Sequence, residues 1–374
     1  MLQAAQAVFP GVKALAVKPD YGDPPPQLEN TEVILAGHPV PNQESVRAAE
    51  RALELVSLLA PTDLLLVLVS GGGSALWCAP HGISLEEKRG LTESLLCSGA
   101  DIEEINAVRK HLSKIKGGRL VTATKARVLA LCISDVPSND LSVVASGPTV
   151  PDPTSYQDAL EVLERYRLSL RESGAVKQLK RGQKGLLPES PKPGDASFAR
   201  VENRLVGSSI NFLEAAKKYL EKRNYPVLIL SDRFQGEARE LARFHAGVVE
   251  SIRKNHQPVA PPVVLLSGGE ASVSVKGKGL GGRNQEFLLW LLYYLKGAGV
   301  WALAADTDGI DGNTTAAGAV TGPDSWSRAL AGRLDPKDFL FDNNAYGFFD
   351  KLGDTLITGP TANNLNDYRA ILVF

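Results

Sequence analysis

Three carboxylates stand close together in a stretch that is poorly suited to packing. Asp306, Asp308 and Asp311 follow directly after the apolar run Val300–Ala305. Anions at this spacing repel one another unless a cation lies between them. Arg283 stands upstream, at the expected start of a helix, where a cation opposes the helix macrodipole. Carboxylates for a divalent metal, together with a guanidinium for phosphate, are the equipment of phosphoryl transfer.

Each of these groups also has a structural interpretation. A stretch rich in Asp and Gly can be an ordinary turn. It is not a calcium loop, because Ile310 stands where that pattern needs a ligand followed by Gly. Arg283 could be an ordinary exposed arginine after the glycine-rich hinge Gly277–Gly282. We predict that Arg283 is catalytic and that the three carboxylates serve Mg²⁺.

A glycine-rich turn follows the apolar run Leu64–Val69. Glycines let backbone N–H groups turn toward an anion, and ligands of open α/β sheets bind at such strand ends. The turn matches neither the dinucleotide fingerprint nor the standard P-loop, and a tight turn without a ligand is the alternative. We expect a cradle for phosphate or carboxylate made by Ser70, Gly71, Gly72, Gly73 and Ser74.

A basic stripe is expected on the predicted helix Ile102–Ile115. Asn106, Arg109 and Lys110 recur there at helical spacing, and Ser113 and Lys114 continue the pattern. Such a stripe can equally be a solvated helix face. Its place between two strand-end motifs favours a role in binding substrate or phosphate.

Two more candidates stand in turns. Asp135 follows the apolar run Val128–Ile133 and could be a general base or a metal ligand. His38 lies in Gly37–Pro41 and could bind a ligand. Turn chemistry explains both positions equally well.

Short apolar runs alternate with longer amphipathic patterns, which predicts an α/β fold with mainly parallel sheets. The expected strands are Glu32–Ala36, Leu64–Val69, Val128–Ile133, Val227–Leu230, Val263–Leu266 and Val300–Ala305. The expected helices are Gln43–Leu59, Leu85–Ser98, Ile102–Ile115, Tyr156–Tyr166, Ile210–Lys222, Gly236–Lys254 and Asn284–Lys296.

The length of 374 residues suggests two or three domains, at ~150 residues per domain. One segment, Arg181–Ser197, is rich in Pro, Gly and charge, as linkers are. We therefore predict a first domain over residues 1–180 and a second over residues 198–374.

The composition excludes several classes of protein. A net charge of -1 gives no general attraction to nucleic acid or to anionic membranes, and no apolar stretch reaches the ~20 residues that span a bilayer. Cys78, Cys97 and Cys132 form no Cys-x-x-Cys pair, which favours a reducing compartment. We expect a cytoplasmic protein.

Taken together, the motifs resemble the glycerate 2-kinases of the MOFRL type (class II glycerate kinases), which are often named hydroxypyruvate reductases. The likeness spans nearly the whole chain and rests on Gly37–Pro41, Ser70–Ser74, Asn106–Arg119, Ser134–Pro137, Ala145–Pro153, Leu266–Glu270, Gly281–Glu286 and Asp306–Gly312. It implies two α/β domains, the first Rossmann-like, with an active-site cleft between them. It also implies transfer of the γ-phosphoryl group of ATP to the 2-hydroxyl of D-glycerate with Mg²⁺, giving 2-phosphoglycerate and ADP. A homodimer is compatible with the sequence.

Nucleotide binding is expected in the second domain. Leu265–Ser272 repeats the pattern of a strand that runs into a small glycine turn, although the ends of parallel strands can require this pattern without any ligand. The polar loop Thr358–Asn364 could close over the site of Asp306, Asp308 and Asp311. The residues expected to bind the nucleotide are Gly268, Gly269, Glu270, Asn284 and Asn363.

One departure from the family concerns the N-terminus. Family members carry an N-terminal strand and a Gly-Lys-Ala-Ala turn, whereas this chain opens within the helix Leu2–Val8 expected after that turn. We therefore expect the first domain to lack that strand and that lysine, and a form extended upstream to be more active.

Two other functions stay open. One is an NAD(P)H-dependent hydroxypyruvate reductase, although no Gly-x-Gly-x-x-Gly follows a strand and no acidic residue stands at the ribose-binding distance. The other is a nucleotide- or metabolite-binding protein with impaired catalysis.

Overall fold

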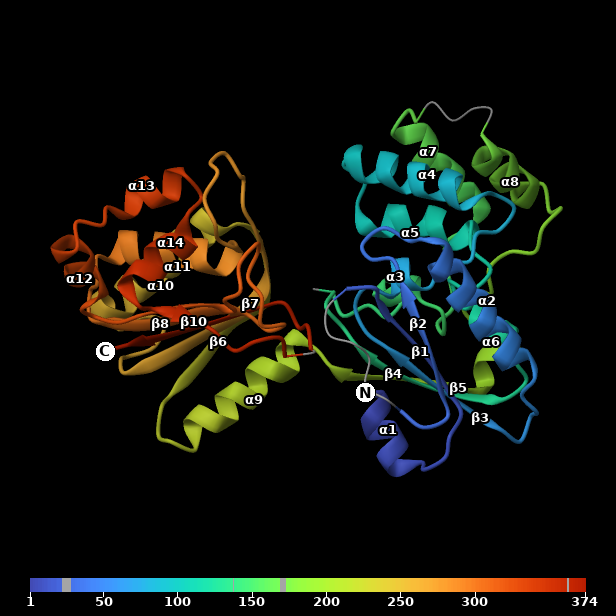
Figure 1. The fold of residues 1–374 in the computed structure, drawn as a ribbon, viewed down its shortest axis with the longest axis horizontal. Coiled ribbons are helices and arrows are strands. Elements are labelled where there is room, and N and C mark those ends of the chain that lie inside the picture. Colours follow the sequence, from blue (N-terminus) through green and yellow to red (C-terminus); the bar gives the residue numbers. More distant parts are fainter. Residues whose placement is uncertain (22–27, 137, 169–172, 362) are drawn as a thin grey trace. The chain divides into compact units, whose positions relative to one another are not determined.

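The chain forms two compact units, Met1–Val206 and Gly207–Phe374 (Figure 1). The computed structural model describes residues 1–21, 28–136, 138–168, 173–361 and 363–374. The division lies after the segment 181–197 in which we expected a linker, so residues 198–206 belong to the first unit. The guanidinium of Arg200 explains why, because it donates to the carbonyl oxygens of Val121 and Ala126 and so holds this segment to the first unit.

The first unit contains two small sheets. A parallel pair joins β1 (Ala14–Pro19) to β2 (Thr31–Ala36), and a second sheet has the order β3-β4-β5. Its strands are β3 (Leu64–Val69), β4 (Arg127–Ile133) and β5 (Val201–Gly207), with β3 and β4 parallel. The helices are α1 (Leu2–Val8), α2 (Gln43–Ser57), α3 (Gly73–Leu76), α4 (Leu85–Cys97), α5 (Ile102–His111), α6 (Arg119–Thr122), α7 (Tyr156–Arg165) and α8 (Gly174–Gln183), with short 3-10 helices η1 (Val144–Ser146) and η2 (Ala196–Arg200).

Local chemistry fixes where several of these helices begin. Asn42, Ser84, Asp101 and Ser155 each accept a hydrogen bond from the third residue of the following helix, which returns one. These reciprocal caps satisfy backbone donors that would otherwise lack partners. The helices α4, α5, α7 and α8 then pack together around a buried apolar core, as Figure 1 shows at the upper right.

The second unit is built on one six-stranded sheet of order β10-β9-β8-β11-β7-β6. In chain order the strands are β6 (Val227–Glu237), β7 (Val263–Ser272), β8 (Val300–Asp306), β9 (Gly318–Thr321), β10 (Thr355–Leu356) and β11 (Asp367–Val373). The helices are α9 (Ser209–Glu221), α10 (Ala238–Asn255), α11 (Arg283–Leu295), α12 (Ser325–Ala331), α13 (Pro336–Phe341) and α14 (Ala345–Leu352).

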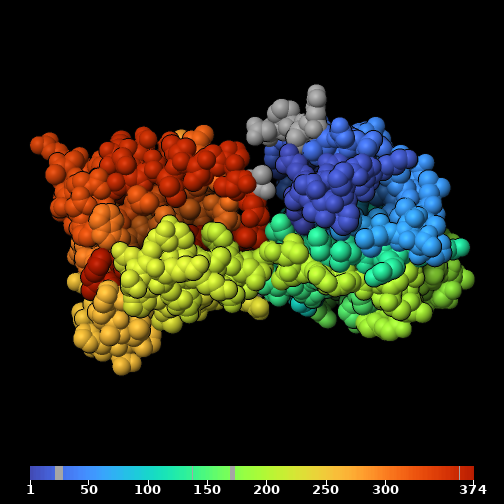
Figure 2. All heavy atoms as spheres, turned by 90° about the horizontal axis from the view of Figure 1, so that it is seen from below, coloured from blue at the N-terminus to red at the C-terminus, as the bar shows by residue number. Residues whose placement is uncertain are grey.

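Helices cover both faces of this sheet. The larger core gathers α10, α11, α13 and α14 on one face, with Phe287, Phe348 and Phe349 fully buried. On the other face α9 packs against β6 and β7 through Leu213. Figure 2 shows α9 in yellow-green on the surface, in line with its mostly exposed polar residues.

The two α/β units agree with the expected fold class, but the second sheet is mixed. β6 and β7 are parallel, whereas β11 is antiparallel to both β7 and β8, and β9 is antiparallel to β8 and β10. Parallel pairing was therefore the wrong prediction for β8. The reason is β11, a strand from the end of the chain that enters the sheet between β7 and β8.

The helices in the described ranges were also compared with what a bilayer requires. None of them combines the length and the apolar character needed to cross a membrane.

Candidate active site

The residues Ser70–Ser74, called the anion turn below, meet several of the predicted site residues. Gly72 has a φ of 78°, a left-handed conformation that favours glycine. A Cβ atom on Gly71 would lie 2.0 Å from Oδ2 of Asp135, and one on Gly72 would lie 2.9 Å from Nε2 of His38. The structure therefore brings both side chains against the turn. His38 is the candidate ligand-binding residue, and Asp135 is the candidate base.

The anion turn offers hydrogen-bond donors. Within the described part of the chain, the backbone N–H groups of residues 71–74 donate to no protein acceptor. On the inner side, the hydroxyl oxygens of Ser74 and Ser146 lie 2.9 Å apart, and Ser146 donates to Oδ1 of Asn106 over 2.9 Å. The Nδ2 atom of Asn106 is buried without a partner among the described groups. Unpaired donors of this kind favour an anionic or carbonyl ligand.

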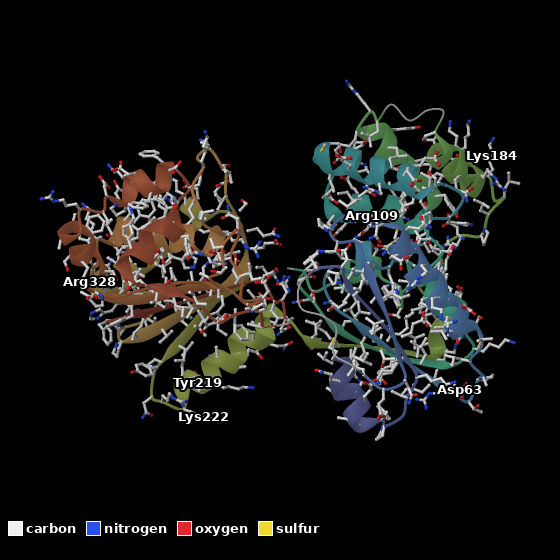
Figure 3. The ribbon with its side chains drawn as sticks, viewed as in Figure 1. Asp63, Arg109, Lys184, Tyr219, Lys222 and Arg328 are labelled. Atoms are coloured by element: carbon white, nitrogen blue, oxygen red, sulfur yellow. The ribbon has the colours of Figure 1, made fainter. Side chains whose placement is uncertain are left out.

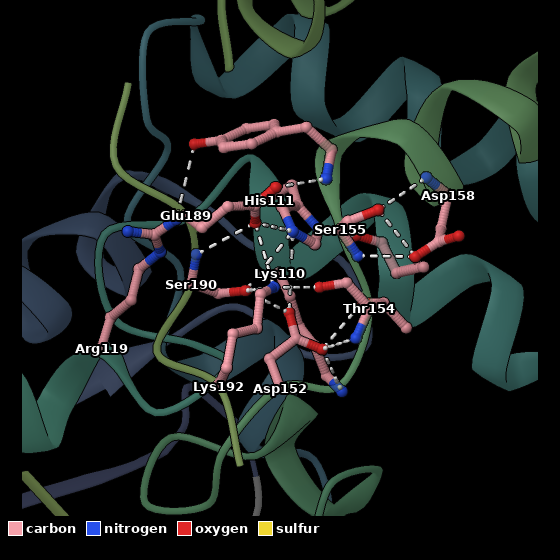
Figure 4. Close-up of polar contacts among 12 residues, drawn as sticks. Lys110, His111, Arg119, Asp152, Thr154, Ser155, Asp158, Glu189, Ser190 and Lys192 are labelled. Carbon is pink, nitrogen blue, oxygen red and sulfur yellow. Dashed lines mark hydrogen bonds and ion pairs between the residues drawn. The ribbon is translucent and has the colours of Figure 1, made fainter. Parts of the chain in front are cut away.

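The basic stripe does not form as predicted, because α5 ends at His111. Lys110 is buried and its Nζ lies 3.4 Å from Oδ1 of Asp152. Figure 4 shows that pair inside a network in which Asp152 also accepts from Thr154 and Ser190. A lysine already paired in this way is occupied by the protein, so Lys110 is not available as we expected.

Arg109 remains the strongest member of the stripe. Its guanidinium forms no ion pair with any described residue, and burial lowers its pKa. It is labelled in Figure 3, on α5. Beyond the helix end, Lys114 is exposed, with Nζ 3.9 Å from Oε1 of Glu50. The exposed member of the stripe is thus a surface group, whereas Arg109 lacks a counterion that a ligand could supply.

Sequence reasoning missed two buried lysines next to this site. Lys116 donates to the carbonyl oxygens of Gly73 at 3.4 Å and Ala145 at 3.2 Å. Lys88 donates to the carbonyl oxygens of Leu112 at 2.6 Å and Arg109 at 3.3 Å. Burial lowers the pKa of Lys116 to about 7 and that of Lys88 to about 8. Charge patterns give no sign of such burial, since lysine is ordinarily exposed.

In the second unit, Arg283 lies among three carboxylates. Its Nε donates to Oδ1 of Asp367 at 2.7 Å, Nη1 to Oε1 of Glu270 at 2.8 Å and Nη2 to Oδ2 of Asp306 at 2.9 Å. Burial lowers the pKa of Arg283, but attraction to these three groups outweighs burial and raises it overall. The side chain is 23% exposed. A guanidinium has five N–H donors, so this arrangement leaves two for a ligand.

The carboxylates predicted to bind metal have other partners. Asp311 accepts from the backbone N–H groups of Asn284 at 3.0 Å and Gln285 at 2.8 Å, which caps α11. Asp306 pairs with Arg283, and Asp308 accepts from the N–H of Ile310 at 2.8 Å. The described residues contain no group of three side chains that could hold a metal ion. The prediction of a three-carboxylate Mg²⁺ site is corrected accordingly.

Burial raises the pKa values of two of these acids. It raises the pKa of Asp311 to about 6, although the two backbone N–H groups pull that pKa down. Burial also raises the pKa of Asp306, while the charge of Arg283 opposes the rise. Both acids therefore sit where their charge is costly unless the neighbouring donors stay in place.

The residues Gly277–Gly282, called the clasped segment below, are not a free hinge. The N–H groups of residues 276 and 277 donate to Oδ1 of Asn343, and those of 278 and 279 donate to Asp342. The next two donate to Oδ1 of Asn344 and of Asn313. A Cβ atom on Gly277 would lie 2.2 Å from the Asp342 backbone. Glycine is needed here for close packing, and the N–H groups of residues 276–281 are already satisfied.

The expected nucleotide residues lie in three different settings. Gly268 and Gly269 are inside β7, not in a turn, because that strand runs on to Ser272. A Cβ atom on Gly269 would lie 2.1 Å from the carbonyl oxygen of Phe234 on β6, so close strand approach explains this glycine. Asn363 is exposed, and its N–H donates to Thr361.

The other two expected nucleotide residues support the arginine. Glu270 pairs with Arg283, and Asn284 donates from Nδ2 to Oδ1 of Asp367 at 2.8 Å. Asn284 is fully buried, and its Oδ1 has no partner among the described groups. Their position beside Arg283 is consistent with the prediction, while nucleotide contact itself stays a prediction.

Asp367 and Arg369 were missed by the sequence reasoning. Both are buried on β11; Arg369 donates to Oδ2 of Asp367, and its guanidinium lies 4.8 Å from the centre of the Phe287 ring. Asp367 in turn holds Arg283. The signal was a charged residue at alternate positions of the last apolar run, which we had not assigned as a strand.

Known proteins match this chain over most of its length. A family model described as a domain of unknown function (DUF4147) covers residues 1–180, and one described as MOFRL family covers residues 263–367. A D-glycerate 2-kinase of Thermotoga maritima is 41% identical over 93% of this chain and 81% of its own length. The chain belongs to the MOFRL family of glycerate kinases.

Other members of this MOFRL family carry more than one name. A protein of Agrobacterium vitis named as a hydroxypyruvate reductase is 46% identical over 100% of this chain and 84% of its own length. The crystal structure of a glycerate kinase from Thermotoga maritima superposes with a TM-score of 0.91 at 39% identity, over 100% of this chain and 88% of that one. The fold of this chain is therefore the fold of that kinase.

Proposed function

We propose that this protein is an ATP-dependent D-glycerate 2-kinase, which moves the γ-phosphoryl group of ATP to the 2-hydroxyl of D-glycerate and yields 2-phosphoglycerate and ADP. The observation that carries the proposal is the likeness to a solved glycerate kinase over the whole chain at 39% identity. At this identity and coverage the two chains share more than a fold.

In the first unit, the proposal rests on the anion turn. Its N–H groups and the guanidinium of Arg109, for which the described residues supply no acceptor or ion-pair partner, suit the carboxylate of glycerate or a phosphoryl group. Asp135 and His38 lie against the turn. Asp135 is our candidate for accepting the proton of the 2-hydroxyl of D-glycerate. A carboxylate within hydrogen-bonding distance of that hydroxyl can act as a general base.

In the second unit, Arg283 is our candidate for stabilising charge on the transferred phosphoryl group. Three carboxylates fix its orientation before any ligand arrives, so little reorganisation is needed. The two N–H donors left over can donate to an equatorial phosphoryl oxygen.

The Mg²⁺ ion is best written as part of the MgATP substrate. Asp306 and Asp311 are committed to Arg283 and to the start of α11, so the carboxylates of this region do not fit a protein-built metal centre. Mg²⁺ is commonly held by nucleotide phosphates and only one or two carboxylates. Asp308 is the candidate for that contact, since one of its oxygens has no partner among the described groups.

A hydroxypyruvate reductase is the second candidate, because relatives carry that name. Contrary to the expectation from the sequence, the glycines at 277, 279 and 282 have the spacing of a dinucleotide fingerprint and lie between β7 and α11. However, the N–H groups of this clasped segment donate to Asn343, Asn344, Asn313 and Asp342. A dinucleotide pyrophosphate needs free N–H groups at that place, so the structure favours the kinase.

A coupled assay decides between the candidates. The purified chain is mixed with MgATP and D-glycerate, and ADP release is followed. A parallel reaction contains hydroxypyruvate and NAD(P)H, and loss of the reduced cofactor is followed. ADP release that depends on D-glycerate supports the kinase. Cofactor oxidation without any ADP release would refute it.

The cellular setting completes the proposal. Cys78, Cys97 and Cys132 are all free thiols, which supports a reducing compartment such as the cytoplasm. A homodimer stays a prediction that a solution mass measurement can test.

A further inference from the structure

The backbone and the side-chain amine of Lys116 both lie where they can support the conformation of the anion turn. Its backbone precedes Gly117 and Gly118, whose φ values of 58° and 77° let the chain turn at the end of this segment. Its side chain is 2% exposed and ends between the carbonyl oxygens of Gly73 and Ala145. These carbonyls belong to the anion turn and to the facing segment. Lys116 therefore joins two stretches of backbone that are distant in the sequence.

The facing segment is conformationally unusual. Ala145 and Ser146 have φ values of 50° and 59°, which non-glycine residues rarely adopt. A Cβ atom on Gly73 would lie 2.6 Å from Cβ of Ala145, so the two stretches are in close contact. Such strain persists only when surrounding contacts hold it, and the bond from Lys116 to the Ala145 carbonyl is one of those contacts.

The bond to Gly73 also sets the direction of a donor. The carbonyl and N–H of one trans peptide unit point in opposite directions. Because Lys116 holds the Gly73 carbonyl, the N–H of Ser74 points away from Lys116. That N–H has no acceptor among the described residues. Lys116 thus contacts the carbonyl side of this peptide unit, while the N–H of Ser74 on the opposite side stays available for a ligand.

The surroundings of Lys116 are short of negative charge. It forms no ion pair with a carboxylate in the described part of the chain, and Lys88 and Arg109 add positive charge nearby. The titratable and charged groups that face this region from the elements packed around it are His38, Cys78, Lys88, Arg109, Lys110, Asp135 and Asp152. Lys110 and Asp152 pair with each other. An anion on the turn would supply a negative charge that Lys116 lacks.

We propose that Lys116 is a positioning residue that couples binding of an anion at the anion turn to the uptake of a proton by its side chain. The proposal rests on the proposed function in that the anion is the carboxylate of D-glycerate or a phosphoryl group. The proton comes from the buffer and adds to the neutral amine to give the ammonium. No other bond is made or broken.

The pH dependence follows from the charge state of Lys116. Burial lowers its pKa to about 7, so the free protein holds a largely neutral amine at pH 7.5. A bound anion favours the charged form and raises that pKa. Affinity for the anion is then constant well below pH 7, where the amine is charged in both states. It falls as pH rises above 7, by at most about tenfold per pH unit.

Calorimetry on the full chain tests the coupling. D-glycerate is titrated at pH 7.5 in two buffers that differ in ionisation enthalpy, and the difference in heat gives the protons taken up. We expect about half a proton per site or more. Lys116→Gln should abolish the uptake and raise the KM for D-glycerate more than it lowers kcat. Inorganic phosphate is the second probe. Uptake with phosphate but not with D-glycerate would support the proposal and identify the occupant as a phosphoryl group only if Lys116→Gln abolishes it, because phosphate itself takes up protons near neutral pH. Phosphate-linked uptake that persists in Lys116→Gln would refute the proposal.

Two control variants make the result specific. Lys88→Gln removes another fully buried lysine, whose bonds go to the end of α5 and not to the turn. It should keep the proton uptake. His38→Gln tests whether the other titratable side chain against the turn, which lies beside Gly72, takes up the proton instead. If the uptake vanishes in His38→Gln and persists in Lys116→Gln, the proposal is wrong.

The same protein separates this inference from the proposed function. Absence of ADP release with D-glycerate would refute the kinase, while phosphate-linked proton uptake could still be measured. Normal ADP release with equal proton uptake in the parent chain and Lys116→Gln would refute only the role of Lys116. If Lys116→Gln fails to fold, the parent chain suffices: an anion affinity that stays constant between pH 7 and 8.5 would overturn the proposal.

Discussion

Two glycine-rich segments of this chain look alike in sequence and differ in structure. The N–H groups of residues 71–74 in the anion turn have no acceptors among the described residues, and buried Lys116 lies behind them. The N–H groups of the clasped segment donate to Asn343, Asp342 and their neighbours. Glycine accompanies N–H groups without acceptors in the first segment and allows close packing in the second. The number of glycines therefore does not reveal a binding site; the hydrogen-bond partners of the backbone do.

The clasped segment leads directly into α11 and fixes the position of Arg283 at the start of that helix. Gly282 precedes α11, and a Cβ atom on it would lie 2.3 Å from Cγ of Asp311. This close contact places Asp311 beneath the start of the helix and Arg283 among its three carboxylates. The anion turn thus leaves donors without acceptors among the described residues, whereas the region around Arg283 orients a single cation through many satisfied hydrogen bonds.

Removing Arg283 should give the largest effect. We expect Arg283→Ala to lower kcat by ~10²–10³, as loss of one charge-stabilising group typically does. Arg328→Ala is the matched control, because Arg328 also pairs with carboxylates, at 2.7 Å from Asp354 and 3.0 Å from Asp324 (Figure 3). Turnover and melting temperature are measured for both. Equal loss of stability with unchanged kcat in both variants would make Arg283 purely structural.

A methyl group in the anion turn tests whether that turn binds substrate. Gly72 and Gly99 have nearly the same φ, 78° and 79°, but a Cβ atom meets His38 at Gly72 and nothing within 4 Å at Gly99. Alanine at either position should cost about 1 kcal/mol from the left-handed backbone. Only Gly72→Ala should also lower kcat/KM, by about 10–100-fold. Equal activity of the two variants would place the substrate elsewhere.

Loosening the clasped segment should affect stability first. Asn343 accepts from two N–H groups of this segment and has a φ of 51°. Asn343→Gly removes the side chain without straining the backbone and should cost about 1–3 kcal/mol. Asn224→Gly is the control, since Asn224 has a φ of 63° and is exposed. The KM for D-glycerate should not change in either variant. A raised KM in Asn343→Gly would mean that this segment also contacts the substrate.

Replacing Asp308 or Asp311 singly should give the smallest effects, and the two variants should differ in which property changes. Asp308→Asn should raise the Mg²⁺ concentration for half-maximal rate by on the order of a few-fold, because a neutral oxygen binds a hard cation less well. Asp311→Asn should leave that concentration unchanged and lower stability by about 1 kcal/mol through the weakened helix cap. The reverse result would restore Asp311 as a metal ligand.

Much of the local structure was predictable from the sequence. The strand Leu64–Val69 was assigned with the bounds that β3 has, and the helix Gln43–Leu59 begins where α2 begins. Apolar periodicity and capping residues are read within a few residues of one another, so they are visible in any window of the chain. Asp135 and His38 were also predicted just after strands, as observed, but their proximity to the anion turn was not predicted and their roles stay predictions.

The tertiary structure alone decided which of the candidate groups are free. The sequence by itself determined the candidate site groups, which are the glycine turn, Arg283 and the cluster of acids. It did not reveal that Lys110 pairs with Asp152, that Asp311 caps a helix, or that β11 from the end of the chain holds Arg283 through Asp367. A charge is available to a ligand only if no partner has taken it. Those partners lie far away in the chain and meet only when the sheet and its helices pack.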